Sequence, residues 1–288
     1  MGYSSRYHVA SLIAVFLALA IGILLGAALG GDTLSDTRRN LEKSLAGNLE
    51  DAHERADQLN TELGQANEFA GRVYPVLVRN QLRGRRIGVV ALGELPGDVS
   101  NAIEEALEAT GARLVAVGVV REPVDSRALA GDLSKTRFAN VARDADTQAE
   151  FGVGVGRQLV RGGKLLDRVR SQVFSRASGN FGTLDGVIVV RNQPQKMGPV
   201  QRATAGRIES ALMDGITATR APAVGVESST AEASSVSFFQ ESDISSVDNV
   251  DLVAGRLAAV FALLGAEGSF GVKGSADRLL PDLLPPRR

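Results

Sequence analysis

The chain has 288 residues, a formal net charge of −1, no cysteine and two histidines. This length allows one well-filled core with an appendage, and the near-zero charge offers no bulk attraction to nucleic acid. The missing cysteines exclude disulfides, zinc–cysteine sites, iron–sulfur clusters and thiol nucleophiles. Because His8 and His53 both precede the globular part, that part cannot build a Ser-His-Asp triad or a His-ligated metal centre. We therefore predict no enzyme, no cofactor and no nucleic-acid partner.

The first predicted element is a membrane anchor. The run from Val9 to Leu29 is apolar and uncharged, and as a helix it spans roughly 30 Å, the thickness of the hydrocarbon core. Tyr3 and Tyr7 precede it, where interfacial aromatic residues belong. A cleaved signal peptide is the alternative, but its apolar region is shorter, about 7–15 residues. We predict a retained single-pass anchor within residues 1–31, with the lipid bilayer as its partner.

Two further expectations concern this anchor. Gly22 and Gly26 form a G-x-x-x-G pattern, which can serve as a helix-packing face. The positive-inside count sets Arg6 against the basic residues from Arg38 to Lys43 and, taken alone, favours a cytoplasmic C-terminal domain. Large domains cross membranes regardless of such counts. We expect the domain outside the cytoplasm, partly because of the resemblance given below.

Residues 32–83 are predicted to form a helical stalk. Apolar residues follow one another at spacings of three and four, with charged residues between them, as in a coiled coil with one stutter. The predicted interface residues are Leu34, Leu41, Leu45, Leu49, Ala52, Ala56, Leu59, Leu63, Ala66, Ala70 and Val73. Pro75 should end or kink this helix near Tyr74, after about 60 Å. We expect a homodimer through the seam; the alternative is a helix that lies along its own domain.

Residues 84–280 are predicted to form an α/β domain with an open, mostly parallel sheet, flavodoxin-like or Rossmann-like in layout. Short apolar runs predict the strands, and stripes of helical period predict the helices between them. The predicted strands are Ile87–Leu92, Leu114–Val120, Val187–Val190, Ala223–Val226 and Val236–Phe239. The predicted helices are one that is capped by Asp98 and ends at Gly111, then Thr147–Phe174, Val200–Thr217 and Val250–Leu264. Residues 281–288 are proline-rich and predicted to be a flexible tail.

Three motifs of the domain resemble ligand sites, and each has a simpler interpretation. The loop Gly93–Asp98 lacks both G-x-G-x-x-G and G-x-x-x-x-G-K-[ST], and its acids would repel a phosphate. Gly152–Gly156 is rich in glycine but follows no strand, which indicates helix packing or a kink. Ser228–Thr230 follows a strand and could cup an anion with backbone amides, but without a nearby base it fits an ordinary turn.

Metal ligands are sparse in the sequence. Asp243, Asp248 and Asp251 resemble a calcium cluster only loosely, and Asp248-Asn249 is more simply a helix cap. Cuprous ion prefers cysteine, methionine or histidine ligands. The available donors, no two of which have ligand spacing, are Met1, Met197, Met213, His8 and His53. The residues alone therefore predict no metal site.

Three segments resemble a known family. The opening Arg6-Tyr7-His8-Val9, which continues into SLIAVFLALAIGILLG, is similar to the start of the actinobacterial MctB-like family, named for copper transport at the outer membrane. Ser246–Asp251 followed by AGRLAAVFALLG, and Gly268–Gly274 running on to Leu280-Pro281, resemble its C-terminal signatures. The resemblance covers essentially the whole chain. It implies a copper efflux protein, but members are also linked to envelope remodelling and to control of septal peptidoglycan hydrolysis with a membrane partner; it carries over no catalytic residue.

We predict a non-enzymatic, single-pass protein of the cell envelope that acts through its stalk and domain on protein partners, such as a cell-wall hydrolase. The reasons are the single anchor, which cannot line a channel unless several copies assemble, and the absence of clustered copper ligands. The α/β pattern also lacks the alternating segments of roughly 10 residues that an outer-membrane barrel shows. The first alternative is copper homeostasis or efflux at the outer membrane, and the second is a small-molecule-binding sensor that uses the α/β domain.

Overall fold

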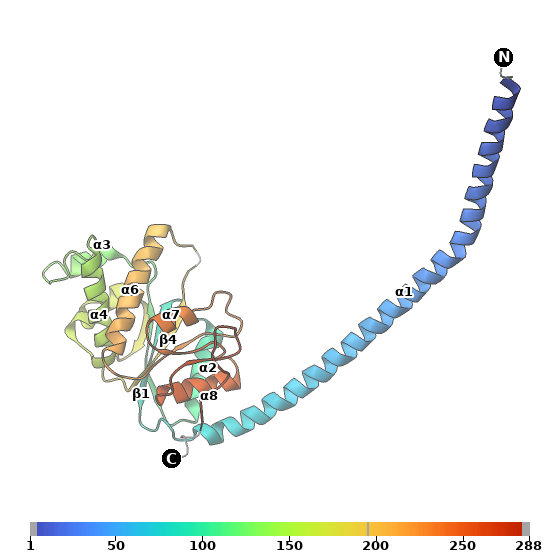
Figure 1. The fold of residues 1–288 in the computed structure, drawn as a ribbon. Helices are drawn as coiled ribbons and strands as arrows, with labels where there is room; N and C mark the ends of the chain where they lie inside the picture. Colours follow the sequence, from blue (N-terminus) through green and yellow to red (C-terminus); the bar gives the residue numbers. More distant parts are fainter. Residues whose placement is uncertain (1–4, 195, 284–288) are drawn as a thin grey trace. The chain divides into compact units, whose positions relative to one another are not determined.

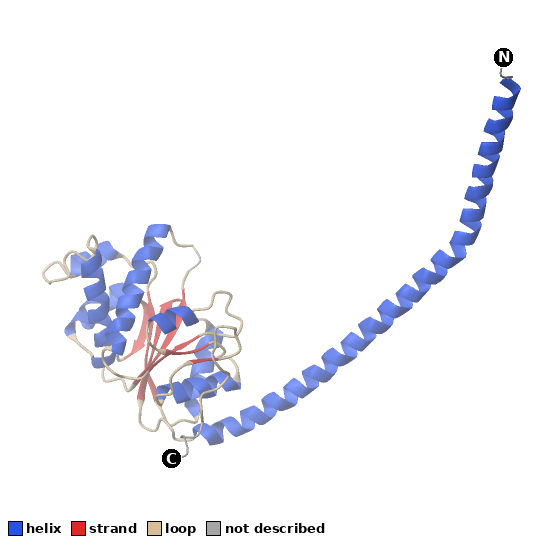
Figure 2. Ribbon diagram, in the orientation of Figure 1, coloured by secondary structure: helices blue, strands red, loops and turns tan. Residues whose placement is uncertain are grey.

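The computed structural model describes residues 5–194 and 196–283, and the chain divides into two compact units, Met1–Ala66 and Asn67–Arg288. Helix α1 (Ser5–Val78) makes up the first unit and enters the second. The second unit contains the sheet, whose strands are red in Figure 2, and the remaining helices. The predicted α/β class and the predicted N-terminal apolar helix are therefore confirmed.

Helix α1 contains the predicted anchor. His8–Ala28 is long and apolar enough to cross a membrane. Gly22 and Gly26 lie in this span, and a Cβ added to either would meet no atom within 4 Å from a neighbouring element of the described residues. Pro75 does not stop the helix, which continues to Val78. A proline is tolerated there because α1 ends one turn later, so few intrahelical hydrogen bonds remain to be lost.

The last turns of α1 belong to the core of the domain. Tyr74, Val78 and Leu82 are buried, and the Tyr74 hydroxyl donates a 2.6 Å hydrogen bond to the carbonyl oxygen of Ala106. Burial raises the pKa of this phenol well above its usual range. The second unit thus starts at Asn67, within the segment 32–83 that the sequence assigns to the stalk.

One seven-stranded sheet organises the domain, in the order β3-β2-β1-β4-β5-β6-β7. All neighbouring strands are parallel except β2 and β3, which are antiparallel. The strands are β1 (Arg86–Gly93), β2 (Arg113–Val120), β3 (Phe174–Gly179), β4 (Gly186–Asn192), β5 (Ala223–Val226), β6 (Ser245–Val247) and β7 (Ser269–Phe270). The remaining helices are α2 (Gly97–Glu108), α3 (Ser126–Asp132), α4 (Ala145–Arg161), α5 (Lys164–Val173), α6 (Pro199–Thr217), α7 (Val236–Glu241) and α8 (Val253–Leu263).

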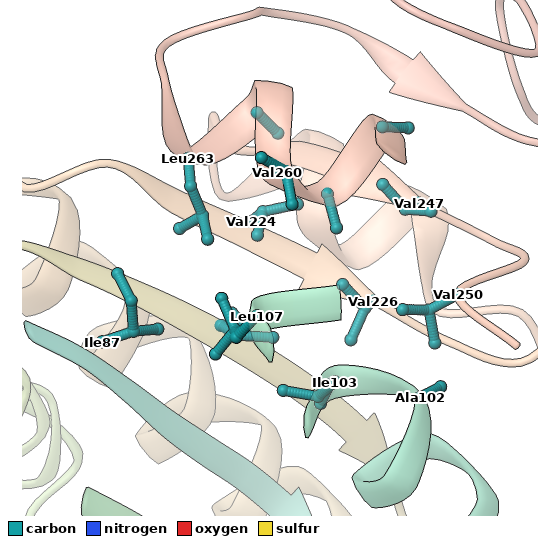
Figure 3. Close-up of a cluster of buried hydrophobic side chains, with 14 of the residues drawn as sticks. Ile87, Ala102, Ile103, Leu107, Val224, Val226, Val247, Val250, Val260 and Leu263 are labelled. Carbon is teal, nitrogen blue, oxygen red and sulfur yellow. The ribbon is translucent and has the colours of Figure 1, made fainter. Parts of the chain in front are cut away.

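The central strands β1 and β4 are buried along most of their length, because helices cover both sides of the sheet (Figure 1). On one side, Ile87 and Val89 of β1 pack with the end of α1, with α2 and with α8. Figure 3 shows this cluster, with Leu107 of α2 and Val260 of α8 directed towards the strands. On the other side, Val90 of β1 packs with α3 to α7. Continuous apolar strands are typical of a doubly covered parallel sheet.

Glycines join two helices on the second side. The predicted packing role of Gly152–Gly156 is confirmed, because α4 lies against α6 there. A Cβ on Gly156 would overlap the carbonyl oxygen of Leu212, and a Cβ on Gly215 would overlap that of Val153. Only glycine therefore allows the two backbones to approach so closely.

Four local predictions are wrong. Asp98 does not cap α2, which starts at Gly97, has Pro96 in the cap position and has no side-chain cap. Val236–Phe239 is not a strand but part of α7, where Val236 and Phe239, three residues apart, share one buried face. The predicted single helix Thr147–Phe174 is two, α4 and α5, because Gly162 and Gly163 adopt φ values of 76° and 155° and break it. Asp248-Asn249 does not cap the last helix, since α8 starts only at Val253.

Candidate functional site at the carboxyl edge of the sheet

A cleft opens where the strand order of the sheet reverses. From β1 the chain proceeds to β2 on one side, and from β4 it proceeds to β5 on the other, so β1 and β4 flank the switch point. The loops that follow β1, β4 and β5 surround a cavity of about 370 Å³ at the carboxyl ends of these strands. In open α/β sheets, this crevice is where ligands bind. It is the candidate site with the strongest topological argument.

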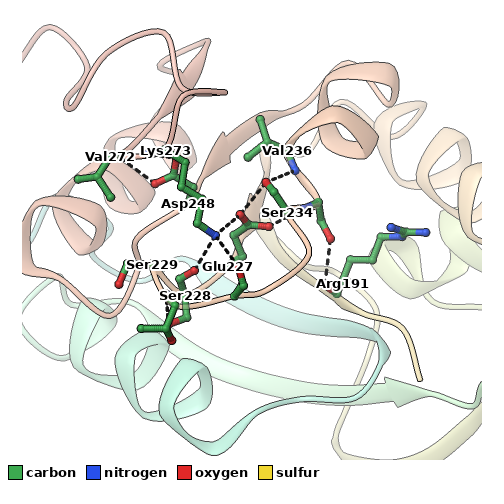
Figure 4. A network of polar contacts seen from close by, with 12 residues as sticks. Arg191, Glu227, Ser228, Ser229, Ser234, Val236, Asp248, Val272 and Lys273 are labelled. Carbon is green, nitrogen blue, oxygen red and sulfur yellow. Dashed lines mark hydrogen bonds and ion pairs between the residues drawn. The ribbon is translucent and has the colours of Figure 1, made fainter. Parts of the chain in front are cut away.

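A buried ion pair holds one wall of the cleft (Figure 4). The carboxylate of Glu227, which follows β5 and is 4% exposed, accepts a 2.7 Å bond from Lys273 Nζ. It also accepts bonds from the hydroxyl of Ser234 and the backbone amide of Ser235, at 2.8 and 2.5 Å. Lys273 donates further to the carbonyl oxygens of Ser228 and Ala231, at 3.0 and 3.4 Å. Glu227 and Lys273 are thus paired with each other and hydrogen-bonded to neighbouring groups of the protein. These bonds hold the loop after β5 in place.

Asp248 fixes the segment that supplies Lys273. Its carboxylate accepts hydrogen bonds from the backbone amides of Val272 and Lys273, at 2.8 and 2.9 Å (Figure 4). Gly271, with φ of 148°, precedes them, and a Cβ at this position would overlap the Asp248 carboxylate. The glycine-rich segment Gly268–Gly274 therefore serves to wrap the backbone around an acid from the end of β6.

The sequence predicted neither an anion site nor a calcium site here, and the groups considered for them bond to other groups of the protein. The amide and hydroxyl of Ser229, each at 2.6 Å, donate to the carboxylate of Asp251, so the turn Ser228–Thr230 already holds an anion. The carboxylate of Asp251 accepts hydrogen bonds from Ser229, and that of Asp248 accepts them from the backbone amides of Val272 and Lys273. Across residues 5–194 and 196–283, no group of three or more His, Cys, Asp or Glu side chains could hold a metal ion.

A second polar cluster was not predicted from the sequence. Glu209 of α6, 2% exposed, accepts bonds from Arg191 Nε and from Gln193 Nε2, at 3.1 and 2.9 Å. Glu122, which follows β2, buries both carboxyl oxygens, and no donor among the described residues reaches them. Burial and, after it, the neighbouring Glu209 raise the pKa of Glu122 to about 9, against the lowering effect of Arg191. Glu122 is therefore a neutral acid at physiological pH.

No sequence signal marked this second cluster. Its members come from three separated segments, and each is a common surface residue type. The position of Arg191 and Gln193 at the end of a strand was the one usable hint, because such positions face the switch-point crevice. Arg191 also lies over the ring of Phe238, 4.4 Å from its centroid, so its guanidinium is held by both an acid and an aromatic ring.

The predicted interface residues of the stalk lie on α1, outside the carboxyl edge. Five leucines in this row are 59–64% exposed in the single chain: Leu41, Leu45, Leu49, Leu59 and Leu63. The alanines Ala52, Ala56 and Ala66 are also exposed. Ala70 and Val73 are half-buried, and the side chain of Leu34 lies outside the described residues. Self-association through this apolar row stays a prediction.

The soft donors considered for copper are spread along the chain. Met197 and Met213 are buried, at 7% and 0% exposure, in different parts of the chain: the loop before α6 and the interior of α6. His8 and His53 lie on α1, and Met1 lies outside the described residues. These positions do not provide the soft ligand set that a resident cuprous ion needs.

The sequence model of one protein family matches residues 3–281, and this family is described as "Copper transport outer membrane protein, MctB". The matched residues include the apolar span of α1 and every strand of the sheet. A comparison with curated proteins gives no match.

Proposed function

The chain belongs to the family of copper transport outer membrane proteins called MctB, and from this premise we propose that it serves copper handling in the cell envelope. The observation that carries the proposal is the extent of the family match, which includes both the membrane-spanning segment and the α/β domain. A copper role of the family therefore concerns this whole architecture rather than one shared module.

The donor set limits how the protein performs this role. Copper would be cargo here, and the chain has no cysteine and only scattered methionine and histidine. We therefore propose that a single domain does not ligate the ion itself. The protein instead acts as an anchored, non-enzymatic component that assembles with other envelope proteins, and the domain lies outside the cytoplasm.

A growth experiment tests the copper role. A strain lacking the protein should grow normally without added copper and should stop growing at copper concentrations that the parent strain tolerates. Full-length protein should restore tolerance, whereas a variant with Phe16→Asp and Leu17→Asp, which puts charges into the apolar span, should not. Equal copper tolerance of the deletion strain and its parent would contradict the proposal.

A second candidate function follows from the exposed apolar row on α1. Leucines such as Leu45 and Leu59, 60% and 64% exposed, are placed where a helix from a second copy or a partner would cover them. We propose, as the alternative, a scaffold that regulates cell-wall remodelling or septal peptidoglycan hydrolysis through such contacts. Division or cell-wall defects in the deletion strain without added copper would favour this function over copper handling.

A further inference from the structure

The switch-point cleft has a charge pattern that selects its ligand. Its lining contains three acids, Asp98, Glu227 and Glu232, and one arginine, Arg191. Glu227 is neutralised by Lys273, and Arg191 is neutralised by Glu209. Two carboxylates, those of Asp98 and Glu232, are left over.

These two carboxylates are also free of hydrogen-bonding partners. Among the residues that the structure describes, no hydrogen bond or ion pair engages the side chain of Asp98, Glu232 or their neighbour in the lining, Asn192. The other polar side chains of the lining are already bonded: Arg191 and Gln193 to Glu209, and Ser228 to Thr230. A ligand would thus meet two anionic acceptors and one amide, and no free cation.

This pattern excludes the phosphate-bearing ligands that the fold commonly binds. The cations near the cleft, Arg191 and Lys273, are each held by a buried carboxylate and are not available to a phosphate. The loop after β1 adds Glu94 and Asp98 in place of a phosphate-binding glycine sequence. The phosphates of a nucleotide would therefore be repelled by Asp98 and Glu232 and would meet no unpaired cation among the described residues of the lining.

We propose that the switch-point cleft binds a small aliphatic amine, with one or two primary ammonium groups on a short carbon chain. The ammonium groups pair with Asp98 and Glu232, and the carbon chain lies against Pro96 and Val99. A volume of about 370 Å³ suits a molecule of this size and is at the lower end for ligand pockets. This amine site is separate from the proposed copper role, and the amine proposal does not rest on that role.

Matched probes on the full-length protein in detergent micelles test the proposal by titration calorimetry. The amine probe is 1,4-diaminobutane, the neutral probe of the same shape is 1,4-butanediol, and the anionic probe is inorganic phosphate. We expect saturable binding of the diamine, binding of the diol at least about tenfold weaker, and no binding of phosphate, because charge pairing supplies the affinity. No saturable diamine binding up to about 10 mM, or equal affinity for the diol, would overturn the proposal.

Variants of the lining locate the site. The double variant Asp98→Asn, Glu232→Gln keeps shape and removes both free charges, and it should lower diamine affinity at least about tenfold. Glu241→Gln, an exposed acid on α7 outside the lining, should leave it unchanged. Because Asp98 and Glu232 are exposed and unbonded, both variants should unfold at the wild-type temperature, which excludes misfolding as the cause. Unchanged affinity in the double variant would place diamine binding elsewhere and refute the assignment, while the copper experiment would be unaffected.

Discussion

Glu122 is the residue at which the fold most changes ordinary side-chain chemistry. Its carboxyl oxygens are buried without a donor, next to the carboxyl of Glu209, so the charged form would face both a dry environment and a like charge. The folded protein therefore keeps this proton, with a pKa of about 9, while the unfolded chain releases it near the ordinary glutamate pKa of 4.5. Folding and protonation are thereby linked.

This linkage predicts how stability depends on pH. Because the pKa is raised in the folded state, the contribution of Glu122 is fully present below about pH 4.5 and is lost as the pH rises through about 9. Urea unfolding of the wild type should therefore show a component that falls between these values, and Glu122→Gln should flatten it. The exposed Glu94→Gln on the same edge serves as the control and should keep the wild-type slope. Equal slopes for wild type and Glu122→Gln would refute a buried neutral acid.

At the scale of elements, the α4–α6 contact depends on the absence of side chains. Gly156→Ala should push the two helices apart, because the new Cβ would overlap the carbonyl oxygen of Leu212. We expect a loss of about 1–3 kcal/mol in the free energy of unfolding. Gly206→Ala, within α6 but with nothing within 4 Å of its Cβ, is the matched control and should gain up to about 1 kcal/mol from helix propensity. Chemical denaturation checks both, and the same sign for both changes would contradict this account.

The sequence predicted the apolar strands well, and it predicted the polar or very short elements poorly. The strands β1, β2, β4 and β5 were predictable because each is a continuous apolar run between turn signals. The edge strand β3 was missed because it is half polar, and the short β6 and β7 carry too few residues for a period. The six residues of α7 resemble a strand for the same reason.

The candidate site was less predictable than the fold. Its location followed from topology, but the pairing of Glu227 with Lys273 joins residues from loops that are distant in sequence. Likewise, no local sequence pattern predicts that Asp251 accepts hydrogen bonds from Ser229 or that Glu209 forms an ion pair with Arg191. These pairings decide which charges remain available, and hence what the cleft can bind.

For the whole molecule, the testable question is whether α1 pairs with a second copy. Pairing with a second copy would bury the exposed leucines of the seam, so we expect the full-length protein to be at least a dimer in micelles. Leu59→Asp together with Leu63→Asp should yield monomers, because two charges in the seam cannot be buried without partners. Glu54→Asp with Glu62→Asp, which leaves the apolar row intact, is the control.

Multi-angle light scattering, corrected for bound detergent, measures these masses. A wild type that is already monomeric would indicate that the seam is covered by a different protein or by no partner. A dimer that survives the two aspartates would place the contact in the membrane span or the domain instead.

The strand order also determines the sequence in which neighbouring strands can pair while the chain is being synthesised. Strand β1 emerges early and pairs at once with β2, but its other neighbour, β4, is separated from it by α2 to α5, since Ile87 pairs with Gly186. During that interval, a central strand rich in valine presents an open edge to other chains. Such distant pairing slows closure of the sheet, because a long loop must be ordered before its contacts form. Pairing of residues 186–192 closes the edge of β1 but opens that of β4, which stays open until residues 223–226 pair with it.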